Sequence, residues 1–185
     1  MKLFFDMDNV LADFESIAQK YKVKGIEVNR PDSLLSAQVL DAKKEFWRRI
    51  EQAAGFWENL PKVANIDLLL TMAYEMGDMH VLSKAPSPKH FVGGQAYVAH
   101  IEKAKKDWIA RHMGKFFPPE NVIVSELPKE RLIQPTKTDI LIDDRPDNIT
   151  PWLGAGGVGI VFKTADQAVK DLSLIKQGKI SQFMR

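Results

Sequence analysis

The sequence contains no cysteine and only four histidines. Without cysteine the chain has neither disulfide bonds nor thiolate chemistry, which fits a reducing compartment. The histidines show neither an H-E-x-x-H motif nor a shared-face spacing, so nothing in their placement suggests zinc. The apolar stretches also fall well short of the roughly 20 residues of a membrane-spanning helix. Disulfide-stabilised, thiol-dependent and membrane-spanning proteins are therefore not expected.

The chain also has no large excess of positive or negative charge. The 26 basic and 24 acidic residues leave a formal net charge of +2, and no lysine- or arginine-rich block argues for a nucleic-acid polymer as partner. The densest basic cluster, "KAKKDW", can be the solvated face of a helix. The N-terminus runs straight into a strand-like segment without the pattern of a signal peptide, so we expect a cytoplasmic protein. Its 185 residues fit one domain with an insertion, and we leave a homodimer open.

Short apolar runs alternate with helical patterns. The runs are nearly continuous, as in strands covered on both faces, and they occupy residues 2–5, 79–83, 121–125, 139–143 and 158–162. Helical spacing links Leu11, Phe14, Ala18 and Tyr21, and helices are expected at 63–76 and 95–113. This alternation predicts an α/β fold, a three-layer Rossmann-like sandwich around a central parallel sheet.

One segment interrupts the alternation. Between the first helix and residue 63 no strand is evident, but "LLSAQVLDAKKEFWRRI" places one apolar face on a helix, with Leu35, Val39, Ala42, Phe46 and Ile50. We interpret residues 21–61 as a small helical cap over the sheet, and residues 1–20 and 62–185 as the core domain.

Polar residues follow four of the expected strands. Asp6 and Asp8 follow the first, Ser83 and Lys84 the second, Lys129 comes after the third, and the fourth ends in Asp143 and Asp144. Asp6 and Asp8 alone could be ordinary turn residues. In a parallel sheet, however, ligands bind beyond the carboxyl ends of the strands, where these side chains would gather. Clustered carboxylates repel one another unless a cation compensates them, and hard oxygen ligands favour Mg²⁺.

Three of these segments together resemble the haloacid dehalogenase superfamily. "DMDNVLAD" is similar to its first motif, "HVLSKA" to its second and "DILIDDRPDN" to its fourth, in the same order and with the insertion in the same place. Within that superfamily the first and fourth runs most resemble the 5′(3′)-deoxyribonucleotidases. The likeness extends over nearly the whole chain.

The resemblance implies roles for individual residues. Mg²⁺ would be held by Asp6, Asp143 and the backbone carbonyl of Asp8, with Asp144 in support. Asp6 would attack phosphorus to give an aspartyl-phosphate, and Asp8 would protonate the leaving oxygen and then activate water. Ser83 and a lysine would bind the phosphoryl oxygens.

The lysines leave alternatives. Lys129, in "SELPKERL", is our choice for the third motif, and Lys137, in "PTKTD", is the competitor. Lys105 lies on the apolar stripe of Val98, Ile101, Trp108 and His112, where a lysine commonly extends to water. It also matches a phosphate-contacting lysine of the nucleotidases. Lys84 stands where a small residue is expected, and its charge is compatible with a phosphate site.

Large aromatic residues belong to the insertion and its edges. Phe14 and Phe56 match positions that resemble the base-binding pocket of the nucleotidases, and Trp47 is expected to join them, whereas Trp57 is interpreted as core. Stacking of a base on an aromatic ring contributes about 1–3 kcal/mol. The run "GAGGVG" satisfies G-x-G-x-x-G, but it leads into a strand instead of opening a helix, so we interpret it as a loop.

The sequence therefore predicts a Mg²⁺-dependent phosphatase of (deoxy)ribonucleoside monophosphates. Two alternatives stay open at this point. One is a phosphatase of another small phosphomonoester, such as a sugar phosphate, and the other is a non-catalytic protein of the same fold that binds a nucleotide or a metal.

Overall fold

The computed structural model describes residues 1–23 and 36–184. Five strands form its sheet: β1 (Lys2–Phe5), β2 (Asp78–Lys84), β3 (Val122–Ser125), β4 (Ile140–Asp143) and β5 (Val158–Val161). The α-helices are α1 (Phe14–Ala18), α2 (Ala37–Gln52), α3 (Ile66–Tyr74), α4 (Gly94–Met113), α5 (Lys129–Leu132), α6 (Pro146–Gly154) and α7 (Ala165–Lys176). Short 3₁₀ turns are η1 (Gln19–Tyr21), η3 (Pro88–His90), η4 (Pro119–Asn121) and η5 (Ile180–Phe183).

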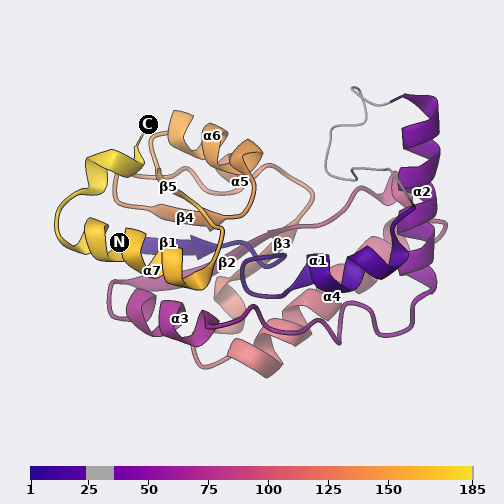
Figure 1. Ribbon diagram of the computed structural model, residues 1–185, viewed down its shortest axis with the longest axis horizontal. Helices are drawn as coiled ribbons and strands as arrows, with labels where there is room; N and C mark the ends of the chain where they lie inside the picture. Colours follow the sequence, from indigo (N-terminus) through magenta and orange to yellow (C-terminus); the bar gives the residue numbers. More distant parts are fainter. Residues whose placement is uncertain (24–35, 185) are drawn as a thin grey trace.

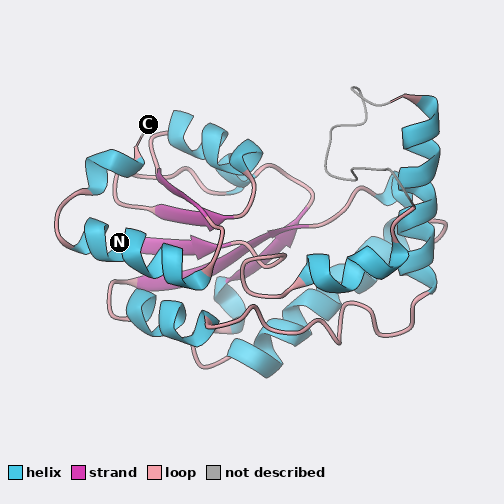
Figure 2. Ribbon diagram, viewed as in Figure 1, coloured by secondary structure: helices cyan, strands magenta, loops and turns pink. Residues whose placement is uncertain are grey.

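The sheet is parallel throughout and has the order β3-β2-β1-β4-β5. Helices α5 and α6 pack on one face around Phe4, Leu141 and Trp152, and α3, α4 and α7 cover the larger core on the other face. Figures 1 and 2 show the strands between these two layers. The three-layer α/β fold predicted from the alternation of apolar runs and helices is confirmed.

The strand predictions agree with the structure to within a residue at most ends, and the helix predictions less closely. The helix expected through Leu11 is wrong at its start, because Leu11 lies in a turn and donates its N–H to the Met7 carbonyl. Helix α3 begins only at Ile66, after the left-handed Asn65. His112, expected on the apolar stripe of α4, is exposed. Helices α6 and α7 were not predicted.

The expected helix of the insertion is present as α2, which lies beyond the carboxyl ends of the strands (Figure 1). Phe46 and Ile50 of its apolar face are buried, whereas Leu35 lies outside the described residues. The chain leaves and re-enters the core side by side, since Asp13 N–H donates to the Pro61 carbonyl and Val63 N–H to that of Leu11. This pairing supports the division that we propose, a core of residues 1–20 and 62–185 and a cap of 21–61, of which 24–35 lie outside the described residues.

The glycine-rich run extends from Gly154, the last residue of α6, through a turn into β5 and opens no helix. Gly156 has a positive φ of 98°, which favours glycine. A Cβ at Gly157 would lie 2.2 Å from the indole nitrogen of Trp152, so this position needs glycine for packing. The run therefore has a structural explanation that needs no phosphate.

His80 on β2 is expected to make the stability of the fold depend on pH. Its ring stacks on Phe4 at 5.0 Å, and burial, with a contribution from Lys2, lowers its pKa. The unfolded chain then binds a proton at His80 more readily than the folded chain, so His80 makes the protein lose stability as the pH falls below about 6.5. We expect His80→Leu to reduce the difference in unfolding free energy between about pH 7.5 and 5.5, measured with urea.

The exposed His100 provides the matched control for this measurement. His100→Leu should change this difference less than His80→Leu does, because solvent screens the contact of the exposed His100 with Glu58 at 3.4 Å. An equal difference in His80→Leu and wild type would show that His80 does not contribute to the pH dependence.

Candidate active site

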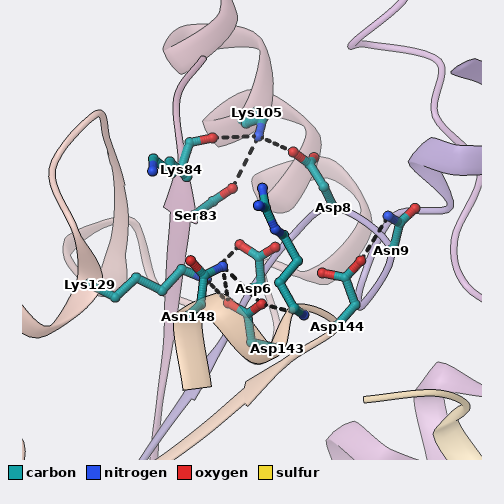
Figure 3. Close-up of polar contacts among 11 residues, drawn as sticks. Asp6, Asp8, Asn9, Ser83, Lys84, Lys105, Lys129, Asp143, Asp144 and Asn148 are labelled. Carbon is teal, nitrogen blue, oxygen red and sulfur yellow. Dashed lines mark hydrogen bonds and ion pairs between the residues drawn. The ribbon is translucent and has the colours of Figure 1, made fainter. Parts of the chain in front are cut away.

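Three carboxylates meet at the carboxyl edge of the central strands. Asp6 follows β1, and Asp143 ends the neighbouring β4 and is followed by Asp144. Each of the three offers an oxygen that lies within 4.8 Å of the others. Asp6 and Asp143 are buried, and Asp144 is partly buried. Figure 3 shows the group at the strand ends.

Lys129 binds two members of this group. Its Nζ donates to Asp6 Oδ1 at 2.8 Å and to Asp143 Oδ2. Lys129 begins α5, which follows the edge strand β3, so its side chain reaches carboxylates that follow or end the strands β1 and β4. Asn148 donates its amide to both oxygens of Asp143 at 3.0 Å, and the Arg145 N–H donates to Oδ1 at 2.9 Å. The Asp143 carboxylate is thus held in one orientation by three donors.

The electrostatics of the group oppose full ionisation. Burial raises the pKa of Asp6 to about 7, Lys129 opposes this shift, and the charges of Asp143 and Asp8 reinforce it. Burial also raises the pKa of Asp144 to about 6, against a hydrogen bond from Asn9. For Lys129, burial lowers the pKa, but attraction to Asp6 and Asp143 outweighs burial and leaves the pKa raised. Further positive charge would stabilise the ionised carboxylates.

A second lysine organises the neighbouring part of the site. Lys105 does not extend to water; it is fully buried on α4. Its Nζ lies 2.6 Å from Asp8 Oδ2, 3.1 Å from Ser83 Oγ and 3.1 Å from the Lys84 carbonyl oxygen (Figure 3). It also lies 5.1 Å from the centroid of the Trp57 ring. Lys105 therefore joins residues that follow β1 to residues at the end of β2.

The structure separates the other candidate lysines from this centre. Lys137 is exposed, whereas its competitor Lys129 is buried among the carboxylates. Lys84 contributes its carbonyl oxygen to Lys105, but its own side chain is exposed and points away from the carboxylates in Figure 3. Asp8 directs its carboxylate at Lys105, so its side chain is not among the three grouped oxygens.

Four aromatic residues lie together, from α1 (Phe14), α2 (Trp47) and the segment that follows α2 (Phe56 and Trp57). Phe14 is half-buried and has its ring centroid 5.6 Å from those of Phe56 and Trp57 and 6.4 Å from that of Trp47. Trp57 is buried, as expected of a core residue. Because the same Trp57 ring lies beneath Lys105, this aromatic cluster adjoins the lysine that contacts Asp8 and Ser83.

Sequence reasoning missed two residues of this site, Asn9 and Asn148. Asn9 donates to Asp144 Oδ2 at 3.0 Å, and Asn148 donates to Asp143. Both stand inside the quoted motifs, "DMDN" and "IDDRPDN". An amide within five residues of the acidic pair of each motif is the signal that could have found them.

The donor set fits a divalent cation. Lys129 compensates one of the three grouped carboxylates, so two formal negative charges remain beside it. All three offer hard carboxylate oxygens, without histidine or cysteine, as magnesium and calcium sites do. Burial raises the pKa values of Asp6 and Asp144, and a bound cation would favour their ionised forms.

A family model described as "5′ nucleotidase, deoxy (Pyrimidine), cytosolic type C protein" matches residues 1–171. The chain belongs to this family. The resemblance seen in the motifs is thereby confirmed, and so is the class of the enzyme, a phosphoric monoester hydrolase of the 5′-nucleotidase type. A small nucleotide is the substrate that the family implies.

Other comparisons add less. The solved structures similar to this deoxynucleotidase-family chain include a hydrolase from Streptococcus pneumoniae TIGR4, with 15% identity and a TM-score of 0.47 over 93% of this chain and 97% of that one. No curated protein gives a significant match. Among the helices of the described residues, none combines the length and the apolar character needed to cross a membrane.

Proposed function

We propose that this member of the deoxynucleotidase family removes phosphate from (deoxy)ribonucleoside monophosphates with the help of Mg²⁺, through an aspartyl-phosphate on Asp6. The observation that carries the proposal is the meeting of two buried lysines with Asp6, Asp8 and Asp143 at one sheet edge. A phosphomonoester is anionic, so a site that attacks it with a carboxylate must first supply positive charge. We further propose that the enzyme acts in the cytoplasm.

The chemistry divides between two carboxylates. A carboxylate oxygen of Asp6 forms a bond to phosphorus while the ester P–O bond breaks, and Asp8 gives its proton to the leaving oxygen. Water then attacks phosphorus and gives a proton to Asp8, and phosphate leaves as the bond to Asp6 breaks. Asp8 is proposed for both proton transfers because its carboxylate lies apart from the three grouped carboxylates, on the side of Lys105 and Ser83.

The remaining polar residues bind and orient. Lys129 is proposed to neutralise charge on the transferring phosphoryl group, and the Ser83 hydroxyl to donate to one of its oxygens. Lys105 holds the Asp8 carboxylate and adjoins Ser83, which places a second positive charge beside the phosphate. Lys84 is exposed and is proposed to attract the anionic substrate.

Asp6, Asp143, Asp144 and the backbone carbonyl of Asp8 would hold the Mg²⁺. When bound, the ion supplies the positive charge that the carboxylates and a phosphate share. The charge left uncompensated beside Lys129 supports this assignment.

The aromatic cluster is proposed to select the substrate. Phe14, Trp47 and Phe56 form the part that a nucleobase would contact, and Trp57 supports both this cluster and Lys105. The indole nitrogen of Trp47 is buried and has no hydrogen-bond partner among the described residues. A cap over the strand ends also excludes macromolecules, which favours a small substrate.

A panel of phosphorylated metabolites tests this function. With Mg²⁺ present, we expect nucleoside monophosphates to be hydrolysed at least about tenfold more efficiently than sugar phosphates, because base stacking contributes about 1–3 kcal/mol. Released phosphate is measured, and kcat/KM is compared across the panel. Much faster turnover of sugar phosphates than of any nucleotide would show that the substrate assignment is wrong.

A further inference from the structure

Asn9 occupies an unusual backbone position beside the site. It follows Asp8 in the turn between β1 and α1 and has a φ of 61°. In the described residues only one other residue besides glycine, Asn65, has a positive φ. Asparagine tolerates this left-handed conformation better than most residues, but glycine fits it without strain. The side chain therefore needs a reason beyond the turn itself.

The amide group of Asn9 makes two hydrogen bonds in different directions. Its Nδ2 donates to Asp144 Oδ2 at 3.0 Å, and its Oδ1 accepts from the Glu15 N–H at 2.8 Å. Among the described residues it is the only hydrogen-bond donor to the Asp144 carboxylate that we find. Figure 3 shows Asn9 turned toward Asp144, outside the contacts of the two lysines.

The second bond reaches the first turn of α1, in the segment of the core that leads to the cap. Glu15 follows Phe14 in the first turn of α1, and Phe14 packs against Phe56 and Trp57 of the aromatic cluster. One side chain thus connects a carboxylate of the cation group to the turn that places an aromatic residue of the proposed base pocket.

We propose that Asn9 is a positioning residue that orients Asp144 for the cation and fixes the Phe14 turn for the nucleoside. The proposal deepens the proposed function and rests on it. Aspartate and glycine also tolerate a positive φ, but neither could replace asparagine here. Aspartate would place a second carboxylate against Asp144, and glycine would lose both hydrogen bonds. Outer-shell groups that orient metal ligands typically change metal affinity by about 10–100-fold when they are removed.

The test uses Asn9→Gly, which keeps the left-handed turn and removes only the amide. We expect Mg²⁺ to bind the metal-free variant at least about tenfold more weakly than wild type, by calorimetric titration with MgCl₂. At saturating Mg²⁺, KM should rise several-fold for a nucleoside monophosphate and less for p-nitrophenyl phosphate, which has no nucleobase. A merely structural role would change the melting temperature without separating the two substrates.

Asn65→Gly is the matched control, because Asn65 has the same backbone conformation at an exposed position with no side-chain cap of α3. It should leave both Mg²⁺ affinity and KM unchanged. Wild-type Mg²⁺ affinity in Asn9→Gly would overturn the inference about Asp144, and equal KM changes for the two substrates would overturn the inference about Phe14.

The failure of the proposed function looks different. If wild type binds Mg²⁺ but hydrolyses no nucleotide, the substrate assignment is wrong, while the calorimetric comparison still decides the role of Asn9 toward the cation. If wild type binds no Mg²⁺, both the cofactor assignment and this inference are overturned.

Discussion

Asp6→Asn is expected to lower the rate of phosphate release from a nucleoside monophosphate by roughly 10⁴-fold or more, since an amide cannot form the bond to phosphorus. The variant should fold, because asparagine has the same shape and Lys129 keeps its second partner, Asp143. Removing a buried carboxylate whose pKa burial raises to about 7 also relieves repulsion with Asp143. Phosphate release and the melting temperature are measured on the same preparation.

Asp147→Asn provides the control for Asp6→Asn. Asp147 lies in the fourth motif, "DILIDDRPDN", but it is exposed and pairs with Arg145 at 3.5 Å, away from the grouped carboxylates. Its substitution should leave turnover within about twofold of wild type. Undiminished hydrolysis in folded Asp6→Asn would exclude an aspartyl-phosphate on this residue.

Lys129→Met is expected to abolish turnover and to destabilise the fold. The lysine is 3% exposed and pairs with two buried carboxylates, so its removal leaves their charges uncompensated. Removing one partner of a buried ion pair typically costs about 3–5 kcal/mol. Urea unfolding measures the loss of stability, and phosphate release, corrected for the folded fraction, measures activity.

Added Mg²⁺ separates the two effects of Lys129→Met. We expect the cation to restore part of the stability by mass action, since it neutralises the same carboxylates. Activity should stay low, because the charge that Lys129 offers to the phosphoryl group is still missing. The exposed Lys137 is the control, and Lys137→Met should change neither quantity. Loss of activity in Lys137→Met alone would reverse the choice between the two lysines.

The sequence was most informative for the strands of the central sheet. The five strands read as continuous apolar runs because both faces of the sheet are covered, and their ends were predicted almost to the residue. Helix α6 was harder to predict, since it contains Pro151 and has only two buried residues. The start of α1 was misjudged because Leu11 is buried by a turn and not by a helix.

The sequence by itself determined the acidic pairs and their common edge. Asp6 and Asp143 end neighbouring parallel strands, and parallel strands present their carboxyl ends on one side of the sheet. The alternation of strands and helices predicts a parallel sheet, so residues 137 positions apart could be assigned to one edge from the sequence. That their two strands are neighbours is a finding of the structure.

Only the tertiary structure decided which polar side chains reach that edge. Lys129 and Lys137 both lie between β3 and β4, but Lys129 begins α5 and is buried among carboxylates, whereas Lys137 is exposed. Lys105 lies on an apolar helical stripe, and only its contacts with Asp8 and Ser83 show that its charge is held inside the site. The direction of a long side chain depends on partners distant in sequence, and local pattern contains no information about them.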